Sequence, residues 1–375
     1  MSGMRPASPT YDLMRAKLKD VVPDFELRLK AELVDEIQRL KHERDAVILG
    51  HNYMEPALFH TVPDFTGDSL ELSRQAAKTT KAVIVFCGVR FMAETAKILN
   101  PDRLVLLPAK VAGCSLAASI TAADVRRLRA QFPGVPVVSY INTYADVKAE
   151  SDICCTSGNA AAVVESLKAP TVIFLPDEYL ARNVAKETGR HIIFPTREPK
   201  ADTTLDRQLI GWPGRCEVHE KFTVADVEAA RRQFPDVIVL AHPECSPEVC
   251  AACDYAGSTS GLVRYVQQST ARRFLLLTEC SMADNIAVEN PDKEMVRMCS
   301  VRCPHMNEIT LEQTRDALLY LQYVITVPED IRNRARRAVD RMLAIGPSGA
   351  FHRRRPAWGE NTLTPSPGGG HHALP

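Results

Sequence analysis

Residues 237–290 read VIVLAHPECSPEVCAACDYAGSTSGLVRYVQQSTARRFLLLTECSMADNIAVEN, and their plan occurs twice more in the chain. The same order of events is found in AVILGHNYMEPALFHTVPDFTGDSLELSRQAAKTTKAVIVFCGVRFMAETAKIL at 46–99 and in VVSYINTYADVKAESDICCTSGNAAAVVESLKAPTVIFLPDEYLARNVAKETG at 137–189. Each segment opens with an apolar run typical of a strand buried on both faces. A turn of small polar residues, an amphipathic stretch and a second apolar run follow. Such repetition indicates three copies of one structural unit.

Strands that alternate with helices in this way form parallel sheets with helices packed outside them. The sequence therefore predicts an α/β protein made of three pseudo-symmetric αβα sandwich units with parallel sheets around a central active site. The predicted segments are an N-terminal helical segment at 1–45, α/β units at 46–115, 116–216 and 217–307, closing helices at 308–345 and a disordered tail at 346–375. A charged insertion, TREPKADTTLDRQL, is expected at 196–209.

Composition narrows the function. The 375-residue chain has 46 basic and 46 acidic side chains, and the absence of a basic stripe argues against nucleic acid as a partner. No apolar run reaches the roughly 18 residues that a membrane span requires, and no secretory signal is visible, so we expect neither a membrane partner nor export. A cytoplasmic location is expected, where the eleven cysteines would be thiols and not disulfides.

The first strand of each unit ends in polar residues, at 51–53, 140–142 and 242–244. Ligands of open α/β sheets bind beyond the carboxyl ends of the strands. The polar turns add hydroxyl groups at predicted helix starts, namely Ser69, Ser157, Ser258 and Thr259. For any single turn an ordinary N-cap is the simpler interpretation. Three turns at matching positions favour a shared site for an anionic ligand, since helix N-termini bind carboxylates and phosphates.

Three cysteines occupy matching places after the last strand of each unit. Cys114, Cys216 and Cys303 are 102 and 87 residues apart, about one repeat each, so pseudo-threefold packing would bring their thiols together. Three thiolates suit either an iron–sulfur cluster with one open iron or a cysteine-rich zinc site, and the spacing does not choose between them. Most of the other cysteines are interpreted as core residues, including the C-x-x-C in a predicted short helix: Cys87, Cys154, Cys155, Cys250, Cys253 and Cys280.

Over residues 45–307 the sequence resembles the quinolinate synthase family. The resemblance is carried, in this order, by GHNY, GDSLELS, GVRFMAETAKILNP, GCSLA, YINTYADVKAESD, TSGNA, GRCEVHEKF, HPE, AGSTSG and CPHMN. It implies three αβα units around one [4Fe–4S] cluster per chain. It also implies condensation of iminosuccinate with dihydroxyacetone phosphate to quinolinate, phosphate and water in NAD biosynthesis, with the cluster as a Lewis acid. The partners implied are these two substrates, with L-aspartate oxidase as the supplier of iminosuccinate.

The resemblance also assigns residues. Its cluster ligands correspond to Cys114, Cys216 and Cys303, and the last of these is chosen over Cys299 because it matches the family's CP motif and precedes Pro304. Proton transfer is assigned to His51, Tyr53 and Glu244. The substrate-binding positions are His51, Ser69, Tyr140, Ile141, Asn142, Ser157, His219, His242, Pro243, Glu244 and Thr259.

Two other functions remain open at this point. An iron–sulfur sensor without catalytic activity would usually carry an output module such as a basic helix for DNA, and none is visible in the sequence. Another cluster-dependent hydro-lyase could act on a different dicarboxylate. Supplying iminosuccinate and dihydroxyacetone phosphate and measuring quinolinate separates all three.

Overall fold

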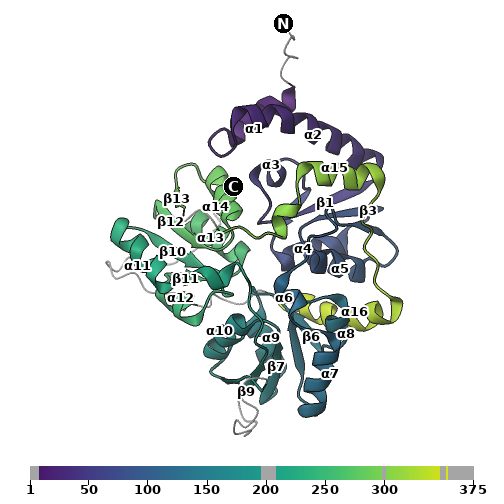
Figure 1. Ribbon diagram of the computed structural model, residues 1–375, viewed down its shortest axis with the longest axis vertical. Helices are drawn as coiled ribbons and strands as arrows, with labels where there is room; N and C mark the ends of the chain where they lie inside the picture. The colour runs from purple at the N-terminus through teal and green to yellow at the C-terminus, as the bar shows by residue number, and fades with distance from the viewer. Residues whose placement is uncertain (1–7, 196–207, 298–300, 347–351, 354–375) are drawn as a thin grey trace, which may run out of the picture.

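The computed structural model describes residues 8–195, 208–297, 301–346 and 352–353. Three sheets, each flanked by helices, form three lobes around a common centre (Figure 1). The predicted fold class, an α/β protein of three αβα units, is confirmed. The residues that the sequence assigns to an N-terminal segment form α1 (Pro9–Leu18) and α2 (Asp24–Glu43), and α2 places Leu27, Ala31 and Val34 in the core.

The first unit contains a four-stranded parallel sheet in the order β2-β1-β3-β4. Both central strands are buried along their whole length, which explains their continuous apolar sequence. The elements are β1 (Ala46–His51), α3 (Pro56–Phe59), β2 (Phe65–Gly67), α4 (Ser69–Lys78), β3 (Val83–Cys87), α5 (Arg90–Leu99), β4 (Leu104–Leu106) and α6 (Ser115–Ala118).

The second unit contains a five-stranded parallel sheet in the order β6-β5-β7-β9-β8. Its elements are α7 (Ala122–Gln131), β5 (Val137–Tyr140), α8 (Ala145–Ala149), β6 (Ile153–Cys155), α9 (Ala160–Ser166), β7 (Thr171–Leu175), α10 (Glu178–Thr188), β8 (His191–Ile193) and β9 (Gln208–Gly211). The predicted insertion is wrong for its last two residues, which begin β9 because they pair with β7 and β8. Its residues 196–207 lie outside the described residues.

The third unit contains a sheet in the order β13-β12-β10-β11-β14, parallel except for β14. Its elements are η1 (His219–Lys221), α11 (Val224–Gln233), β10 (Ile238–Ala241), α12 (Pro247–Ala252), β11 (Tyr255–Ala256), α13 (Thr259–Gln268), β12 (Arg273–Leu277), α14 (Cys280–Glu289), β13 (Glu294–Val296) and η2 (Met306–Glu308). The short strand β14 (His352–Arg353) comes from the predicted tail, and the tail's residues 347–351 and 354–375 lie outside the described residues.

Two further helices follow the third unit in the chain, and the later of them joins the first unit to the second. Helix α15 (Leu311–Tyr320) packs on α2, and α16 (Glu329–Leu343) packs on α8 and β6 of the second unit and on α5 of the first. One continuous apolar core runs from the N-terminal helices through all three sheets. The segment boundaries predicted from the sequence stay predictions, but the three sheets fall in three successive parts of the chain.

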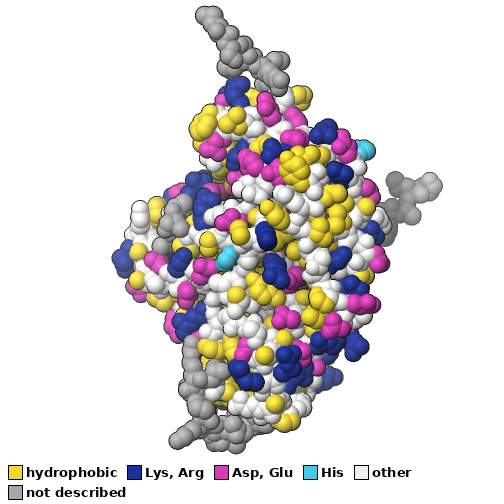
Figure 2. Space-filling model, turned by 45° about the vertical axis from the view of Figure 1, so that its right-hand side comes forward, with side chains coloured by type: hydrophobic (Ala, Val, Ile, Leu, Met, Phe, Trp, Pro, Cys, Tyr) yellow, Lys and Arg dark blue, Asp and Glu magenta, His cyan; other side chains and the backbone are white. Residues whose placement is uncertain are grey.

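Several cysteines interpreted as core residues are buried: Cys87 in β3, Cys154 and Cys155 in β6, and Cys250 and Cys253 in and after α12. Cys280, at the start of α14, is half-buried. Positive, negative and apolar side chains are mixed over the face shown in Figure 2. Within the described part of the chain, no helix combines the length and apolar character needed to span a membrane.

Candidate active site

One cavity at the centre of the molecule collects side chains from all three units. All but two of the site residues predicted from the sequence line it: His51, Tyr53, Ser69, Cys114, Tyr140, Asn142, Ser157, Cys216, His219, His242, Glu244, Thr259 and Cys303. The two exceptions lie behind the wall. The Ile141 carbonyl accepts a hydrogen bond of 2.9 Å from Lys148 Nζ, and the Pro243 carbonyl accepts one of 2.8 Å from Asn183 Nδ2. Hydrogen bonds to Ile141 and Pro243 therefore fix the backbone of the residues on either side of them, Tyr140, Asn142, His242 and Glu244, which do line the cavity.

The three predicted ligand cysteines share one local geometry. The backbone N–H groups two and three residues later in the chain lower the pKa of each thiol, and the Ala117 N–H donates to Cys114 Sγ at 3.5 Å. These donors are Leu116 and Ala117 for Cys114, Val218 and His219 for Cys216, and His305 and Met306 for Cys303. In each case a short helical turn follows the cysteine. Because backbone N–H groups stabilise a thiolate, the geometry suits metal-binding sulfur in all three units.

Burial has the opposite effect on these thiols. It raises the pKa of Cys114 to about 12 and that of Cys303 to about 11, and it raises the pKa of Cys216 well above the usual value. In the absence of a cation the three thiols are therefore protonated at neutral pH. A bound metal supplies the positive charge that keeps them as thiolates, and binding would release protons.

The spacing of the sulfur atoms bears on the kind of metal centre. Among the described residues, the group of three potential ligand atoms that all lie within 4.8 Å of one another is Cys216, His219 and Glu244, and it includes neither Cys114 nor Cys303. A single zinc ion bound by three thiolates would hold them about 3.8 Å apart, given Zn–S bonds of about 2.3 Å. The three cysteine sulfurs thus line one cavity, and at least one pair of them is more than 4.8 Å apart, farther than three thiolates around one zinc ion.

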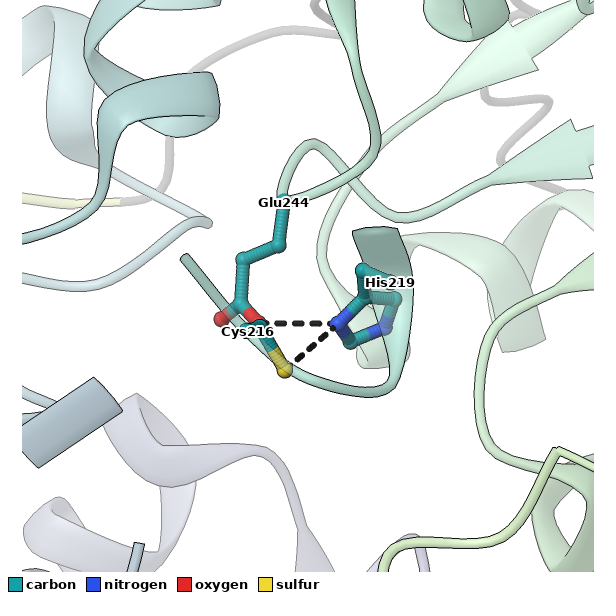
Figure 3. A group of neighbouring side chains, drawn as sticks. All are labelled: Cys216, His219 and Glu244. Atoms are coloured by element: carbon teal, nitrogen blue, oxygen red, sulfur yellow. Dashed lines mark hydrogen bonds and ion pairs between the residues drawn. The ribbon is translucent and has the colours of Figure 1, made fainter. Parts of the chain in front are cut away.

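Glu244 is the centre of a hydrogen-bonded network, part of which Figure 3 shows. Its Oε2 lies 2.8 Å from His219 Nδ1, and the same nitrogen lies 3.2 Å from Cys216 Sγ. Its Oε1 accepts hydrogen bonds from the Tyr140 hydroxyl and, at 3.3 Å, from Asn142 Nδ2. Burial raises the pKa of Glu244, but the two neighbouring histidines, His219 and His242, together with Tyr140 outweigh it, so the pKa lies below its usual value. The carboxylate is ionised and able to accept a proton.

Two histidines of the cavity are held as neutral rings. Burial lowers the pKa of His51 to about 4 and that of His242 to about 3. The backbone N–H two residues later donates to Nδ1 in both cases, from Tyr53 to His51 at 3.2 Å and from Glu244 to His242 at 3.3 Å. The ring hydrogen is therefore on Nε2, and His242 Nε2 lies 3.2 Å from Ser157 Oγ. The repeat thus places the same tautomer in the first and third units.

The polar turns contribute both caps and cavity groups. Ser258 is an ordinary N-cap, with its Oγ accepting from Gly261 N at 3.2 Å. Thr259 follows it and accepts a hydrogen bond of 2.9 Å from Asn52 Nδ2, which joins the third unit to the first. Asp68 caps α4, directly before the predicted site residue Ser69, and lines the cavity as well.

Sequence reasoning missed several residues of this site. Asn52 contacts Thr259, and Asp68 lines the cavity. Both lie inside motifs that carry the family resemblance, GHNY and GDSLELS, directly beside residues that were predicted, and this position could have identified them. His305, which pairs with Glu217 at 3.2 Å, lies two residues after a predicted ligand. Thr278 follows the strand β12 and forms hydrogen bonds with Tyr53 and His219, and nothing in the sequence distinguished it from other strand-end threonines.

Fold and site together define an α/β protein of three similar units that share one cavity, with three candidate metal-binding thiols beside a buried carboxylate and histidines. A protein-family model described as "Quinolinate synthetase A protein" matches residues 35–344. The chain belongs to this quinolinate synthase family.

Named relatives agree with the family match. The chain is 51% identical over 342 residues to "Quinolinate synthase 2" of Mesorhizobium japonicum, covering 91% of this chain and 100% of that protein. It is 52% identical over 339 residues to the "Quinolinate synthase" of Agrobacterium fabrum, covering 90% and 92%. For the "Quinolinate synthase" of Xylella fastidiosa strain Temecula1 the identity is 53% over 312 residues, covering 83% and 87%.

Proposed function

We propose that this chain is a quinolinate synthase that condenses iminosuccinate with dihydroxyacetone phosphate to quinolinate, phosphate and water. The observation that carries the proposal is the shared cavity, in which one cysteine from each unit and the Glu244–His219 pair come together in a chain of this family. The proposal includes L-aspartate oxidase as the supplier of iminosuccinate. It also includes a cytoplasmic location, since a reducing compartment keeps the three thiols available for metal.

Cys114, Cys216 and Cys303 would hold one [4Fe–4S] cluster. At least one pair of their sulfurs is more than 4.8 Å apart, farther than around a single zinc ion, and this distance and the matching backbone N–H groups support the assignment. When bound, the cluster offers one iron without a protein ligand, which acts as a Lewis acid toward substrate oxygen or nitrogen atoms.

The charge of the cavity wall supports a bound cation. Among the described residues that line the cavity there is no lysine or arginine, and two of its histidines, His51 and His242, are neutral. A substrate with two carboxylates would enter a space whose described lining offers hydroxyls, imidazoles and N–H groups and already holds the carboxyl groups of Asp68, Glu217 and Glu244. Burying uncompensated negative charge is costly, so a metal centre in this cavity would make anion binding favourable.

The side chains of the cavity have distinct tasks under this proposal. Glu244, ionised and held by Tyr140 and His219, accepts a proton from substrate carbon or nitrogen and returns it to a departing oxygen. Ser69, Ser157 and Thr259, at or near the starts of helices, donate hydrogen bonds to substrate carboxylate or phosphate oxygens. Tyr53 and Asn142 complete the donors that face the reacting atoms.

The test is a quinolinate assay on anaerobically purified protein. Supplied with iminosuccinate and dihydroxyacetone phosphate, the wild-type chain is expected to form quinolinate and phosphate, and the purified protein is expected to be brown and to contain iron and acid-labile sulfide. A colourless preparation with stoichiometric zinc would refute the cluster. A brown protein that forms no quinolinate would point to a sensor or to a hydro-lyase for another dicarboxylate.

A further inference from the structure

Lys148 is a fully buried lysine directly behind the wall of the cavity. It lies in α8 of the second unit and is 0% exposed. Lysine is almost never completely buried unless its amine has partners, because a buried donor without an acceptor is costly. Its Nζ donates to the Ile141 carbonyl at 2.9 Å and to the Thr143 carbonyl. The same Nζ lies 5.6 Å from the ring centre of Phe91, a residue that lines the cavity.

These hydrogen bonds hold residues 140–143, the strand-end segment, in one conformation. Within the segment, the Thr143 N–H donates to the Ile141 carbonyl at 2.8 Å, and Thr143 Oγ1 donates to the Tyr140 carbonyl at 3.0 Å. Ile141 and Thr143 are 1% and 0% exposed. Tyr140 and Asn142 line the cavity instead, and both donate to Glu244 Oε1 in the third unit. Lys148 thus holds the two buried residues that alternate with the two cavity residues.

A buried carboxylate from the first unit fixes the start of the helix that carries Lys148. Glu94, in α5, is 3% exposed, and its Oε2 accepts a hydrogen bond of 2.8 Å from the N–H of Ala145, the first residue of α8. Its Oε1 accepts one of 2.8 Å from Arg90 Nε. Because Glu94 is anchored in the first unit, Lys148 and the strand-end segment have a fixed place relative to that side of the cavity.

On this geometry, and resting on the proposed function, we propose that Lys148 is a positioning residue that sets the affinity for the dicarboxylate substrate. It acts through the strand-end segment, which carries Tyr140 and Asn142, and does not touch the substrate. Donors that are already aimed lose less conformational freedom on binding than donors that must first be ordered. Without the amine two buried carbonyls lose a donor, and the segment would rearrange to satisfy them.

The chain offers a matched control for this lysine. Lys293 Nζ also donates to two backbone carbonyls, those of Ser269 and, at 3.3 Å, of Ala271. It lies 5.6 Å from the ring centre of Phe274, as Lys148 does from Phe91. Lys293 belongs to the third unit, is half-buried and does not line the central cavity. Lys293→Met therefore removes the same kind of contacts at a place where no substrate is expected.

The experiment compares Lys148→Met, which keeps the length of the side chain and removes the donors, with Lys293→Met. Each lysine variant is also combined with Asn142→Ala, on the strand-end segment, and with Ser69→Ala, a cavity residue at the start of α4 in the first unit. For every protein, quinolinate binding by calorimetry, KM for iminosuccinate, kcat, iron and sulfide content and the urea unfolding midpoint are measured.

We expect Lys148→Met to raise the quinolinate dissociation constant and the KM for iminosuccinate by about 10- to 100-fold, the range for lost hydrogen bonds of a charged group. The value of kcat should fall by less than about threefold, because the lysine touches no reacting atom. Iron and sulfide content should stay at the wild-type level. Lys293→Met should bind quinolinate as wild type does, even where its urea midpoint falls as far as that of Lys148→Met.

The double variants separate positioning from a general loss of stability. Lys148→Met/Asn142→Ala should bind quinolinate no more weakly than the weaker of its two single variants, because a displaced strand-end segment has already lost the Asn142 contact. In Lys148→Met/Ser69→Ala the two losses should multiply, since Ser69 lies on another element. Lys293→Met should multiply with both.

Wild-type quinolinate affinity in Lys148→Met would overturn the inference, and so would losses that multiply with Asn142→Ala as they do with Ser69→Ala. Should Lys148→Met fail to fold, Lys148→Gln, which keeps N–H donors on a side chain one atom shorter, is combined with the same two variants. A smaller loss with the same selective coupling is then expected, and its absence would overturn the inference. A wild-type protein that forms no quinolinate would instead overturn the proposed function, whereas an active wild type with an unimpaired Lys148→Met refutes the role of Lys148 alone.

Discussion

The Gly214 carbonyl accepts a hydrogen bond of 2.7 Å from the backbone N–H of Glu178, and the Gly214 N–H donates to the Pro176 carbonyl at 3.1 Å. The loop that precedes Cys216 is thus paired with the chain that leads into α10. The side chain of Glu178 adds an ion pair of 3.1 Å to Arg215 Nε. These contacts explain how a single cysteine far from other ligands in sequence is fixed at the centre of the molecule.

Gly214→Ala should therefore loosen the Cys216 loop. A Cβ at position 214 would lie 2.6 Å from the Pro176 carbonyl oxygen and 2.5 Å from Ser119 Oγ, so the backbone of the loop must shift. We expect a loss of about 1–3 kcal/mol in unfolding free energy, as for other overpacked sites, and a reduced iron content. Urea unfolding and iron analysis measure both. Gly346→Ala, where an added Cβ meets nothing within 4 Å, is the control and should change neither.

Glu244→Gln is expected to keep the metal centre and lose most turnover. Glutamine retains the size of the side chain and an acceptor for Tyr140, but it cannot take up a proton. The loss of a general acid or base typically lowers the rate by about 10²–10⁴-fold, or roughly 3–5 kcal/mol of barrier. Quinolinate formation and iron content are compared with wild type. Normal turnover at normal iron content would remove Glu244 from the chemistry.

The repeat made the fold predictable from the sequence. Each first strand is an uninterrupted apolar run because its residues are buried on both faces, and the alternation with amphipathic stretches left parallel sheets as the natural arrangement. The short strand β14 could not be foreseen, since two residues in a segment rich in Pro and Gly carry no strand pattern. Its pairing with β11 depends on a contact about 100 residues away in sequence.

The site was only partly predictable. The cysteines and strand-end residues stand at repeat positions, so their meeting at one centre follows from the repeat itself. The matching backbone N–H donors around the three sulfurs could not be predicted, because the residues that supply them differ in type between units. The contact between Thr278 and Tyr53 joins positions more than 200 residues apart and depends on how the units pack, which residue type alone does not reveal.

The buried His51 should make the unfolding free energy fall as the pH falls, and the variant His51→Asn should lack this contribution. Its pKa is lowered by burial from 6.5 to about 4 in the folded protein. Between pH 6.5 and pH 4 the unfolded chain takes up a proton at this position and the folded chain does not. The unfolding free energy therefore falls as the pH falls, by up to about 1.4 kcal/mol per pH unit, and the stabilising contribution is fully present above pH 6.5.

Urea unfolding of the metal-free, reduced chain at pH 7.5 and pH 5 measures this effect. Wild type should lose about 2 kcal/mol more than His51→Asn between the two pH values. Other buried groups, such as Glu279 with a pKa raised by burial to about 7, titrate in both proteins and cancel in the difference. His42→Asn, at an exposed position of α2, should lose as much as wild type. An equal loss in the His51 variant would contradict the prediction.

Cys303→Ser should abolish assembly of a normal metal centre, whereas Cys299→Ser should leave it intact. Cys303 lines the cavity with Cys114 and Cys216, and the backbone N–H groups two and three residues later lower the pKa of its thiol, as they do for the other two. Pro304 disfavours helical geometry at Cys303 and so favours an extended backbone there. Cys299 lies outside the described residues, so its prediction rests on the sequence alone.

Iron, sulfide and quinolinate formation are measured in both serine variants after anaerobic purification, with Cys114→Ser and Cys216→Ser as positive controls. We expect those two controls and Cys303→Ser to lose the normal iron and sulfide content, because a serine hydroxyl is a poor replacement for a soft thiolate ligand. Cys299→Ser should stay near wild type in all three measurements. The reverse outcome, with metal lost at position 299 and kept at 303, would place the third ligand one turn of chain earlier. The similar backbone surroundings of Cys114, Cys216 and Cys303 would then not identify the metal ligands.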